Sequence, residues 1–324
     1  MQARRLVPTL VVLALVTVAT SFAHAAERWQ SFLSPGELKT LIDADRSVVV
    51  VDVRSPAEYA KGHIPGAINL PGTQWRTPDA KPGTGDSQYI FRDPQGRPDV
   101  ARYEALLSAV GLTRDDRVVI YGNHAGKADG SVPAMILRWL GQRQVAFLDG
   151  IGLEQWQSAG FEVSTEPTVR PPAQYVAAPS AEPLVWNLAQ VIDNLSRPGV
   201  VFVDNRSPRE FSGEDLRNNR RGGHIPGAVH LDYEALLDPK TRRILPIQDV
   251  RRLVEQRRIR PADTVVLYCQ TATRSSLPYL ALRDLGFENV AIYDASWHEY
   301  GNRDDTPVER IDFGAAASAA GIAK

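Results

Sequence analysis

The chain has very little cysteine: Cys269 is the only one in 324 residues. A single cysteine excludes an intramolecular disulfide and a cysteine-rich metal site. The six histidines show no spacing typical of metal ligands. Charge of one sign is also lacking, because 37 Lys and Arg face 38 Asp and Glu, a formal net charge of −1. The composition therefore offers no bulk attraction to nucleic acid or to anionic lipid.

The apolar run near the amino end is too short to span a membrane. It extends from Leu6 to Val18, fewer than the ~20 residues that a span needs. Arg4 and Arg5 precede it and Ala23-His24-Ala25 follows it, an order typical of a secretory signal peptide. We therefore expect residues 1–25 to be removed on export. Losing two arginines would give a periplasmic or secreted protein of net charge −3 without a membrane anchor.

Two halves of the chain repeat the same motifs in the same order. The motifs are an apolar run followed by Asp-x-Arg-Ser-Pro-x-Glu-aromatic (48–59 and 200–211), a Gly-His-Ile-Pro-Gly-Ala segment (62–67 and 223–228) and two further apolar runs (117–121 and 145–149, 264–268 and 290–294). Short apolar strands that alternate with helices predict an α/β fold. We expect each half to form a mainly parallel sheet covered by helices on both faces.

The repeats also predict the domain boundaries. We expect a first domain over 26–164, a proline-rich linker over 165–183, a second domain over 184–313 and a flexible tail over 314–324. Residues 72–99 form an insert in the first half that is rich in Pro, Gly and Asp. This insert could fold over the second half's site, but we favour a surface loop, because long loops are only sometimes lids.

The stretch around Cys269 has the character of a reactive loop. Residues 264–267 predict a buried strand, and the apolar spacing from Leu277 onward predicts a helix after the loop. Cys269 would then lie at the carboxyl end of a strand, where open α/β sheets place ligand sites. Loop N–H groups, the helix dipole and Arg274 all favour the thiolate form. The alternative is a buried, inert cysteine that packs as a small hydrophobe.

The first half lacks this chemistry. Gly122 stands at the position of Cys269, and the loop after it has no arginine that corresponds to Arg274. A glycine offers no nucleophile, so we expect the first domain to be inactive and the second to be catalytic.

Together these motifs resemble the tandem-domain form of the rhodanese (sulfurtransferase) superfamily, over nearly all of the mature chain. The resemblance implies two rhodanese-like domains. It also implies a sulfurtransferase in which a small anionic donor such as thiosulfate or 3-mercaptopyruvate leaves a persulfide on Cys269. An acceptor such as cyanide or a thiol, including a protein thiol, then removes the sulfur. No cofactor, metal, nucleic acid or membrane is required after signal cleavage.

The resemblance makes Cys269 the catalytic nucleophile, since an ionised thiol attacks sulfane sulfur without a general base. The anionic persulfide needs several donors, and the residues expected to cradle it are Gln270, Thr271, Ala272, Thr273, Arg274 and Ser275. The candidates for substrate binding are Arg209 and Trp297. Three residues near the site have counterparts in the inactive half or a repeated loop and are expected to be structural: Asp204, Arg206 and His224.

Two other functions stay open. Cysteine-dependent phosphatases and arsenate reductases of related fold have five residues between cysteine and arginine, whereas four separate Cys269 from Arg274, which disfavours them. The chain could instead be a persulfide carrier or binding module that delivers sulfur to a protein partner. The tandem enzymes that this chain resembles tend to have a substrate-binding arginine where it has Glu210. This departure favours thiosulfate over mercaptopyruvate, because the carboxylate of mercaptopyruvate needs a cation.

Overall fold

The computed structural model describes residues 29–76, 89–93, 95–123, 130–178 and 185–311. The expected signal peptide (1–25) and tail (314–324) lie outside these residues. Among the described residues, no helix combines the length and the apolar character needed to cross a membrane.

Each half folds around a five-stranded parallel sheet, which confirms the α/β prediction. The strand order is β1-β5-β4-β2-β3 in the first half and β6-β10-β9-β7-β8 in the second, so the two topologies are the same. The strands are β1 (Phe32–Leu33), β2 (Val49–Asp52), β3 (Ile68–Asn69), β4 (Val118–Tyr121), β5 (Val145–Leu148), β6 (Val185–Trp186), β7 (Val200–Asp204), β8 (Val229–His230), β9 (Thr264–Tyr268) and β10 (Val290–Tyr293).

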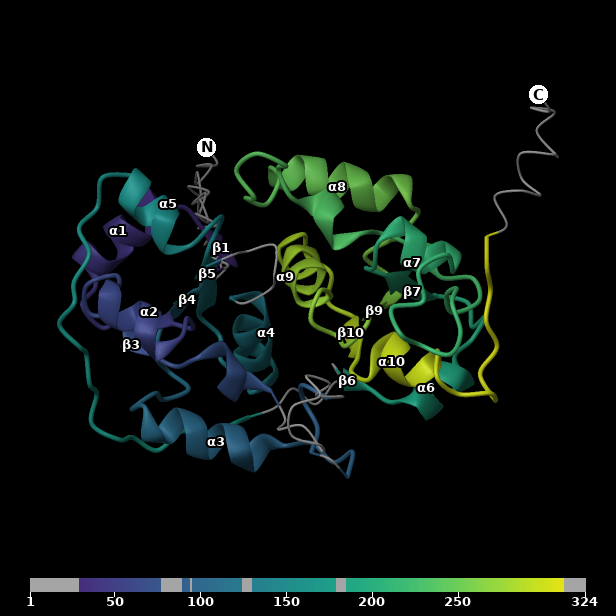
Figure 1. Cartoon of the computed structure of the whole chain (residues 1–324), viewed down its shortest axis with the longest axis horizontal. Helices are drawn as coiled ribbons and strands as arrows, with labels where there is room; N and C mark the ends of the chain where they lie inside the picture. The colour runs from purple at the N-terminus through teal and green to yellow at the C-terminus, as the bar shows by residue number, and fades with distance from the viewer. Residues whose placement is uncertain (1–28, 77–88, 94, 124–129, 179–184, 312–324) are drawn as a thin grey trace, which may run out of the picture.

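Helices connect the strands and cover the sheets (Figure 1). Those of the first half are α1 (Pro35–Ala44), α2 (Pro56–Lys61), the 3₁₀ helix η1 (Gly72–Trp75), α3 (Val100–Ala109), α4 (Ser131–Trp139) and α5 (Leu153–Ser158). Those of the second half are α6 (Leu188–Asp193), α7 (Pro208–Ser212), the 3₁₀ helix η3 (Tyr233–Leu236), α8 (Ile247–Gln256), α9 (Ser276–Asp284) and α10 (Ser296–Tyr300).

Capping residues define where several of these helices begin. A capping box closes four of them, with a side chain that accepts the N3 backbone N–H while the N3 Glu or Gln bonds back; the caps are Ser34, Ser55, Asn187 and Ser207. The sequence motifs did not include β1, α1, β6 and α6. Strands β1 and β6 have only two residues each, too few to show a hydrophobic period. The capping residues of α1 and α6 were a sequence signal from which these two helices could have been predicted.

A continuous apolar core joins the two halves. One face of each sheet contributes to it, including Val51 and Ile120 of the first half and Val265 and Ile292 of the second. Helices α4 and α9 lie side by side between the sheets (Figure 1), and their residues belong to the same core. The other face of each sheet has a separate core of its own. The halves therefore pack as one body through α4 and α9.

Two equivalent aspartates hold the halves together. Asp149, after β5, accepts the backbone N–H of Ile244 at 2.9 Å and pairs with Arg243 at 3.2 Å. Asp294, after β10, accepts the backbone N–H of Ile90 at 2.8 Å and that of Phe91 at 3.2 Å. Both carboxyls are buried, and burial raises the pKa of each to about 6. Each half thus supplies the acceptor for a loop of the other.

The insert of the first half is part of this interface. Trp75, Ile90 and Phe91 are fully buried, and the two N–H groups on Asp294 belong to the insert. The expectation of a surface loop over 72–99 is therefore wrong for Trp75, Ile90 and Phe91, whereas Gln95 and Arg97 are exposed as expected. Composition alone did not reveal the apolar side chains at its two ends as interface residues.

The linker is extended, as expected, over its described residues 165–178, but it follows the surface of the first half closely. Its backbone bonds to that half at Ser108 and Leu140. Tyr175 is buried and donates its hydroxyl hydrogen to Gln142 at 2.8 Å. The linker is thus fixed to the first half rather than hanging free.

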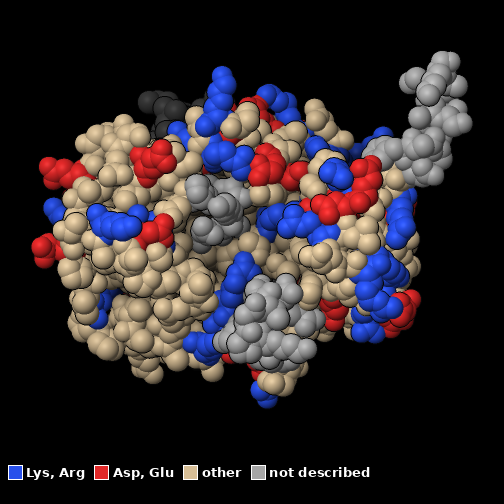
Figure 2. Space-filling model, viewed as in Figure 1, with Lys and Arg blue, Asp and Glu red and all other residues tan. Residues whose placement is uncertain are grey.

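Charges of both signs are distributed over the surface. On the face drawn in Figure 2, blue basic and red acidic side chains alternate across the molecule. This face carries no large area of a single charge, in agreement with the near-neutral composition.

Replacing Asp294 with alanine tests the interface. The variant leaves the N–H groups of Ile90 and Phe91 buried without an acceptor, so the free energy of unfolding should fall by about 2 kcal/mol or more. Urea unfolding measures the change. The matched control is Asp43→Ala, which removes a surface carboxylate and should cost less than about 0.5 kcal/mol. Equal losses in the two variants would contradict this role of Asp294.

Candidate active site

Cys269 follows the last residue of β9 and lies at the carboxyl edge of the second sheet, as predicted. The loop continues to Ser275, and α9 begins at Ser276. Cys269 is fully buried. A strand, a tight loop and a helix therefore place the only sulfhydryl group of the protein where open α/β sheets build their sites.

The loop turns around the hydroxyl group of Ser296. Ser296 Oγ accepts the backbone N–H of Cys269 at 3.3 Å and that of Ala272 at 3.0 Å, and it donates to the carbonyl of Tyr293 at 2.8 Å. Ala272 has φ +58° and Ser296 has φ +52°, both in the left-handed region that non-glycine residues rarely adopt. Such strained residues cluster at functional sites. Here they direct two N–H groups inward and turn the loop.

The remaining N–H groups of the loop are left available. In the described part of the chain, no acceptor bonds to the backbone N–H of Gln270, Thr271, Thr273, Arg274 or Ser275. Ser275 is buried and the other four residues are partly buried, and buried N–H groups are almost always paired. A set of unpaired ones within a single short loop beside a cysteine is the arrangement expected of an anion-binding nest.

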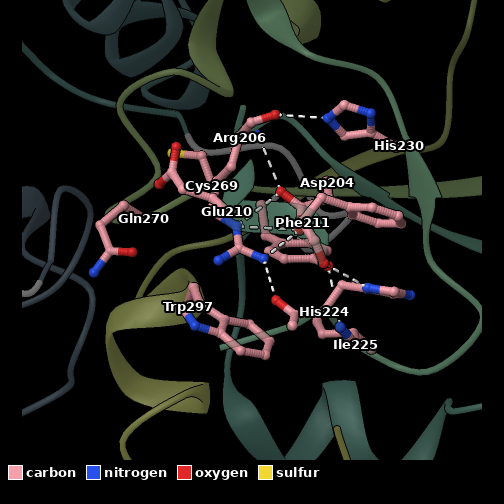
Figure 3. A network of polar contacts seen from close by, with 12 residues as sticks. Asp204, Arg206, Glu210, Phe211, His224, Ile225, His230, Cys269, Gln270 and Trp297 are labelled. Carbon is pink, nitrogen blue, oxygen red and sulfur yellow. Dashed lines mark hydrogen bonds and ion pairs between the residues drawn. The ribbon is translucent and has the colours of Figure 1, made fainter. Parts of the chain in front are cut away.

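The side chain of Gln270 does not contribute to this nest. Its amide exchanges two hydrogen bonds with the amide of Asn219, at 2.9 and 3.1 Å. Figure 3 shows it extending away from Cys269. Gln270 can therefore serve the predicted cradle only through its backbone N–H.

The side chain of Arg274 is also directed elsewhere. Its two terminal nitrogens donate to both oxygens of Glu210, at 2.7 and 2.8 Å, instead of presenting the expected fork to the sulfur. Burial alone would raise the pKa of Glu210, yet Arg274 and Ser207 lower it to about 2. Burial would likewise lower the pKa of Arg274, but its bonds to Glu210 and the nearby charge of Cys269 raise it above the ordinary arginine value.

Two neighbouring serines behave differently. Ser276 Oγ donates to the carbonyl of Thr273 at 2.6 Å and lies 2.7 Å from the hydroxyl of Ser131 in the first half. Ser275 is equally buried, but its hydroxyl has no hydrogen-bond partner within the described residues. A buried hydroxyl without a partner costs free energy, so the Ser275 hydroxyl is a candidate donor to a ligand.

The residues expected to be structural do form the scaffold of the loop (Figure 3). Arg206 pairs with Asp204 at 2.6 Å and donates to the carbonyl of Gly223 at 2.6 Å. His224 stacks on Phe211 with 3.7 Å between ring centroids. The first half repeats these contacts with the same geometry in Arg54, Asp52, Gly62, His63 and Tyr59.

The two candidates for substrate binding lie differently with respect to the cysteine loop. Arg209 is mostly exposed and pairs loosely with Glu214 at 3.5 Å. Trp297 is fully buried; its ring lies 4.4 Å from the guanidinium of Arg206, and its N–H donates to the carbonyl of Arg221 at 3.1 Å. Trp297 thus packs over the scaffold, and its backbone N–H donates to the carbonyl of Cys269 at 3.0 Å.

In the first half, a glycine lies close to the position that corresponds to Cys269. Between β5 and α5 it has Gly152 at φ +65°, where an added Cβ would lie 1.6 Å from the carbonyl oxygen of Gly122. The second half has Ser296 at the start of α10, with room for the hydroxyl that organises the loop. The sequence analysis did not identify Ser296 as a site residue. The two halves differ in sequence directly after β5 and β10, and this difference could have indicated it.

Comparisons with known proteins identify the family. The model of the Rhodanese-like domain matches residues 34–159 and 187–303. The chain therefore belongs to the rhodanese-like domain family and carries the domain twice, which confirms the tandem-domain prediction. Among the described residues, no group of three His, Cys, Asp or Glu is placed to hold a metal ion.

Relatives with known names cover most of the chain. A thiosulfate sulfurtransferase of Azotobacter vinelandii is 32% identical over 288 residues, 86% of this chain and 96% of that protein. One of Pseudomonas aeruginosa is 31% identical over the same shares. The solved structure of an anaerobic ergothioneine biosynthesis enzyme from Chlorobium limicola has a TM-score of 0.74 at 21% identity, covering 88% of this chain and 71% of that one. That likeness concerns the fold alone.

The two serines provide a matched pair of variants. Ser275→Ala removes a buried hydroxyl without a hydrogen-bond partner among the described residues, so the free energy of unfolding should stay within about 0.5 kcal/mol. The rate of the sulfur loading that the sequence predicts for Cys269 should fall. Ser276→Ala removes a bonded hydroxyl and should destabilise by about 1 kcal/mol or more. Urea unfolding and loading rates test both. A Ser275→Ala variant that loses stability but loads normally would contradict a ligand role for Ser275.

The pair of Glu210 and Arg274 predicts a dependence on pH. Glu210→Gln leaves Arg274 buried without its counter-charge, at a cost of about 3–5 kcal/mol at neutral pH. The native pKa of Glu210 lies below its ordinary value of 4.5, so its stabilisation is present above pH 4.5 and is lost as the pH falls toward 2. The difference in unfolding free energy between wild type and Glu210→Gln should therefore shrink over that window.

Glu58→Gln is the matched control for that experiment. Glu58 closes the equivalent capping box in the first half and bonds to Asn123 instead of an arginine. Its substitution should cost far less at neutral pH. Equal costs for the two variants would show that the cap, rather than the ion pair, carries the effect.

Proposed function

We propose that this protein transfers sulfane sulfur from a small anionic donor, such as thiosulfate, to a thiophilic acceptor through a persulfide on Cys269. The names of its relatives support sulfurtransferase activity. The persulfide route and the acceptor, cyanide or a thiol, are our proposal.

The observation that carries the proposal is the set of backbone N–H groups around Cys269 that have no acceptor among the described residues. A persulfide is anionic and extends one sulfur atom beyond the cysteine. It therefore needs hydrogen-bond donors along both sulfur atoms rather than around a single atom. N–H groups from several successive residues of a tight loop meet this need. Because the backbone supplies them, the donors are held in place before the sulfur arrives.

The reaction needs no general base if Cys269 is ionised. The thiolate attacks the outer sulfur of the donor, a new S–S bond forms, and the donor's own S–S bond breaks. With thiosulfate, sulfite leaves with the electron pair. The acceptor nucleophile then attacks the outer sulfur of the persulfide and regenerates the thiolate. Oxidation states balance without any further oxidant or reductant.

The structure also bears on the alternatives. Both terminal nitrogens of Arg274 are held by Glu210, whereas a phosphatase or arsenate reductase needs its loop arginine to clamp a tetrahedral oxyanion. This supports sulfur transfer over oxyanion hydrolysis or reduction. A persulfide carrier that serves one protein partner uses the same nest and is separated from the enzyme only by turnover on small donors.

Export remains part of the proposal. It rests on the charged, apolar and small-residue order of residues 1–25. Under it, the mature protein acts in the periplasm or outside the cell.

Intact mass tests the persulfide directly. After incubation with thiosulfate, the wild-type protein should gain one sulfur atom, about 32 Da, through its thiolate nucleophile. Cyanide should remove the added mass, and Cys269→Ser should never gain it. No gain with thiosulfate, mercaptopyruvate or polysulfide would refute the proposed function. Loading without steady thiocyanate formation would favour the carrier.

A further inference from the structure

A buried amide at the catalytic edge of the second sheet has an oxygen atom that is left without a donor. Asn205 follows the last residue of β7, and its side chain is fully buried. Its Nδ2 donates to the carbonyl of Leu231 at 2.9 Å, and this bond fixes which end of the amide is the oxygen, because a carbonyl cannot donate. The Oδ1 atom has no hydrogen-bond partner among the described residues. Such buried atoms are rare in folded proteins, so this oxygen is a candidate acceptor for a ligand.

The register of the sheet places Asn205 beside Cys269. Strands β7 and β9 are parallel neighbours, and the N–H of Asn205 donates to the carbonyl of Tyr268, the residue before the cysteine, at 2.9 Å. Side chains alternate between the two faces of a sheet. Val203 and Leu267 both belong to the core that the halves share. Asn205 and Cys269 each follow one of them by two positions, so the alternation puts both on this same face.

The first half supports this placement. Val53 stands at the position of Asn205, and Gly122 stands at the position of Cys269. Both residues line one cavity of about 410 Å³. Valine has no polar atom in its side chain, so of these two equivalent positions the one beside the nucleophile is the one that presents an acceptor.

Ser275 shows the same difference between the halves. Its buried hydroxyl also lacks a partner among the described residues, and Gly130 stands at its position before α4. The catalytic half therefore has two buried polar groups where the other half has residues that cannot form a side-chain hydrogen bond. A difference that coincides with the nucleophile indicates a role toward a ligand rather than toward the fold.

The chemistry of an amide oxygen limits what that ligand can be. The oxygen accepts hydrogen bonds and cannot donate them. Thiosulfate, sulfite and cyanide have no proton to offer as ions, and the negative end of the amide dipole repels their charge. A thiol does have a proton, on the sulfur atom that must attack the persulfide. A thiol is therefore the acceptor that fits.

We infer that Asn205 binds the S–H group of a thiol beside the persulfide of Cys269, and that a thiol is the acceptor this site is built to serve. The inference rests on the proposed function, within which it names the acceptor class. In the transfer, the thiol sulfur bonds to the outer sulfur of the persulfide, the S–S bond to Cys269 breaks, and its electron pair stays on Cys269. The proton of the thiol passes to the Cys269 sulfur, which then ionises again.

Single-turnover discharge of the persulfide tests the inference. Cys269 is loaded from thiosulfate, and intact mass follows the loss of the added sulfur to 2-mercaptoethanol or to sulfite at about pH 8, where the thiol is mainly protonated. Asn205→Val copies the first half and should slow discharge by the thiol about threefold more than discharge by sulfite, the loss expected for one hydrogen bond. Asn205→Asp keeps an acceptor and adds a negative charge, so the ratio of the two rates should move the other way.

Asn69→Val is the matched control. Asn69 ends β3 in the first half, and its Nδ2 likewise donates to backbone carbonyls, those of Asp52 at 2.9 Å and Arg54 at 3.0 Å. The variant should lose stability in urea unfolding and keep the wild-type ratio of the two discharge rates.

A second measurement separates the inference from the proposed function. Methyl methanethiosulfonate places a methyl disulfide on Cys269 without any sulfane sulfur. Cleavage of this disulfide by 2-mercaptoethanol, relative to its cleavage by sulfite, should show the same dependence on Asn205. If no donor loads the wild type but this ratio still changes in Asn205→Val, the proposed function fails and the assignment of Asn205 stands.

Two outcomes would overturn the inference while leaving the proposed function intact. One is normal loading with an unchanged ratio in Asn205→Val, which would mean that Oδ1 meets a structural water. The other is equal slowing of thiol and sulfite together with a loss of stability in urea, which would show that the variant had distorted the loop.

Discussion

The site depends on one hydroxyl group that lies beneath the cysteine loop. Ser296 Oγ accepts the N–H groups of Cys269 and Ala272, and this pairing fixes which way the backbone faces at both positions. The other N–H groups of the loop can then face a ligand instead of the protein. Two residues in the left-handed region store strain to make this possible. The binding site is thus made of backbone, and the side chains around it hold the backbone in place.

The duplicated scaffold divides its work between the halves. Both keep the buried Asp–Arg pair, the stacked histidine and the same sheet order. The first half has Gly122 in place of the nucleophile, yet it has the aspartate that anchors the other half. Its insert supplies the reciprocal contact on Asp294. The half without the cysteine is therefore structural for the whole molecule.

Much of this could be predicted from sequence, for identifiable reasons. The buried strands of parallel sheets appear in the sequence as apolar runs, and each run occurs in both halves, so one half supports the assignment in the other. The two α/β domains and the position of Cys269 were therefore predicted correctly. The contacts across the interface between the halves were not predicted. Asp149 and Asp294 lie in similar sequence surroundings, and no nearby motif indicates which loops they bind. The direction of Arg274 was missed for a related reason: a charge seen in sequence does not reveal that Glu210, 64 residues away, takes both of its donors. The role of Ser296 depends on a backbone angle that serine rarely adopts.

The shared core has a consequence for the order in which the chain acquires its structure. A domain usually folds as a unit as it leaves the ribosome, amino end first. Here α4 is apolar around most of its surface, and its partner α9 begins 145 residues later in the chain. The nascent first half must therefore expose that surface until most of the second half has been synthesised. Such a delay favours factors that hold the chain unfolded, which is also the form in which chains are threaded through a membrane pore.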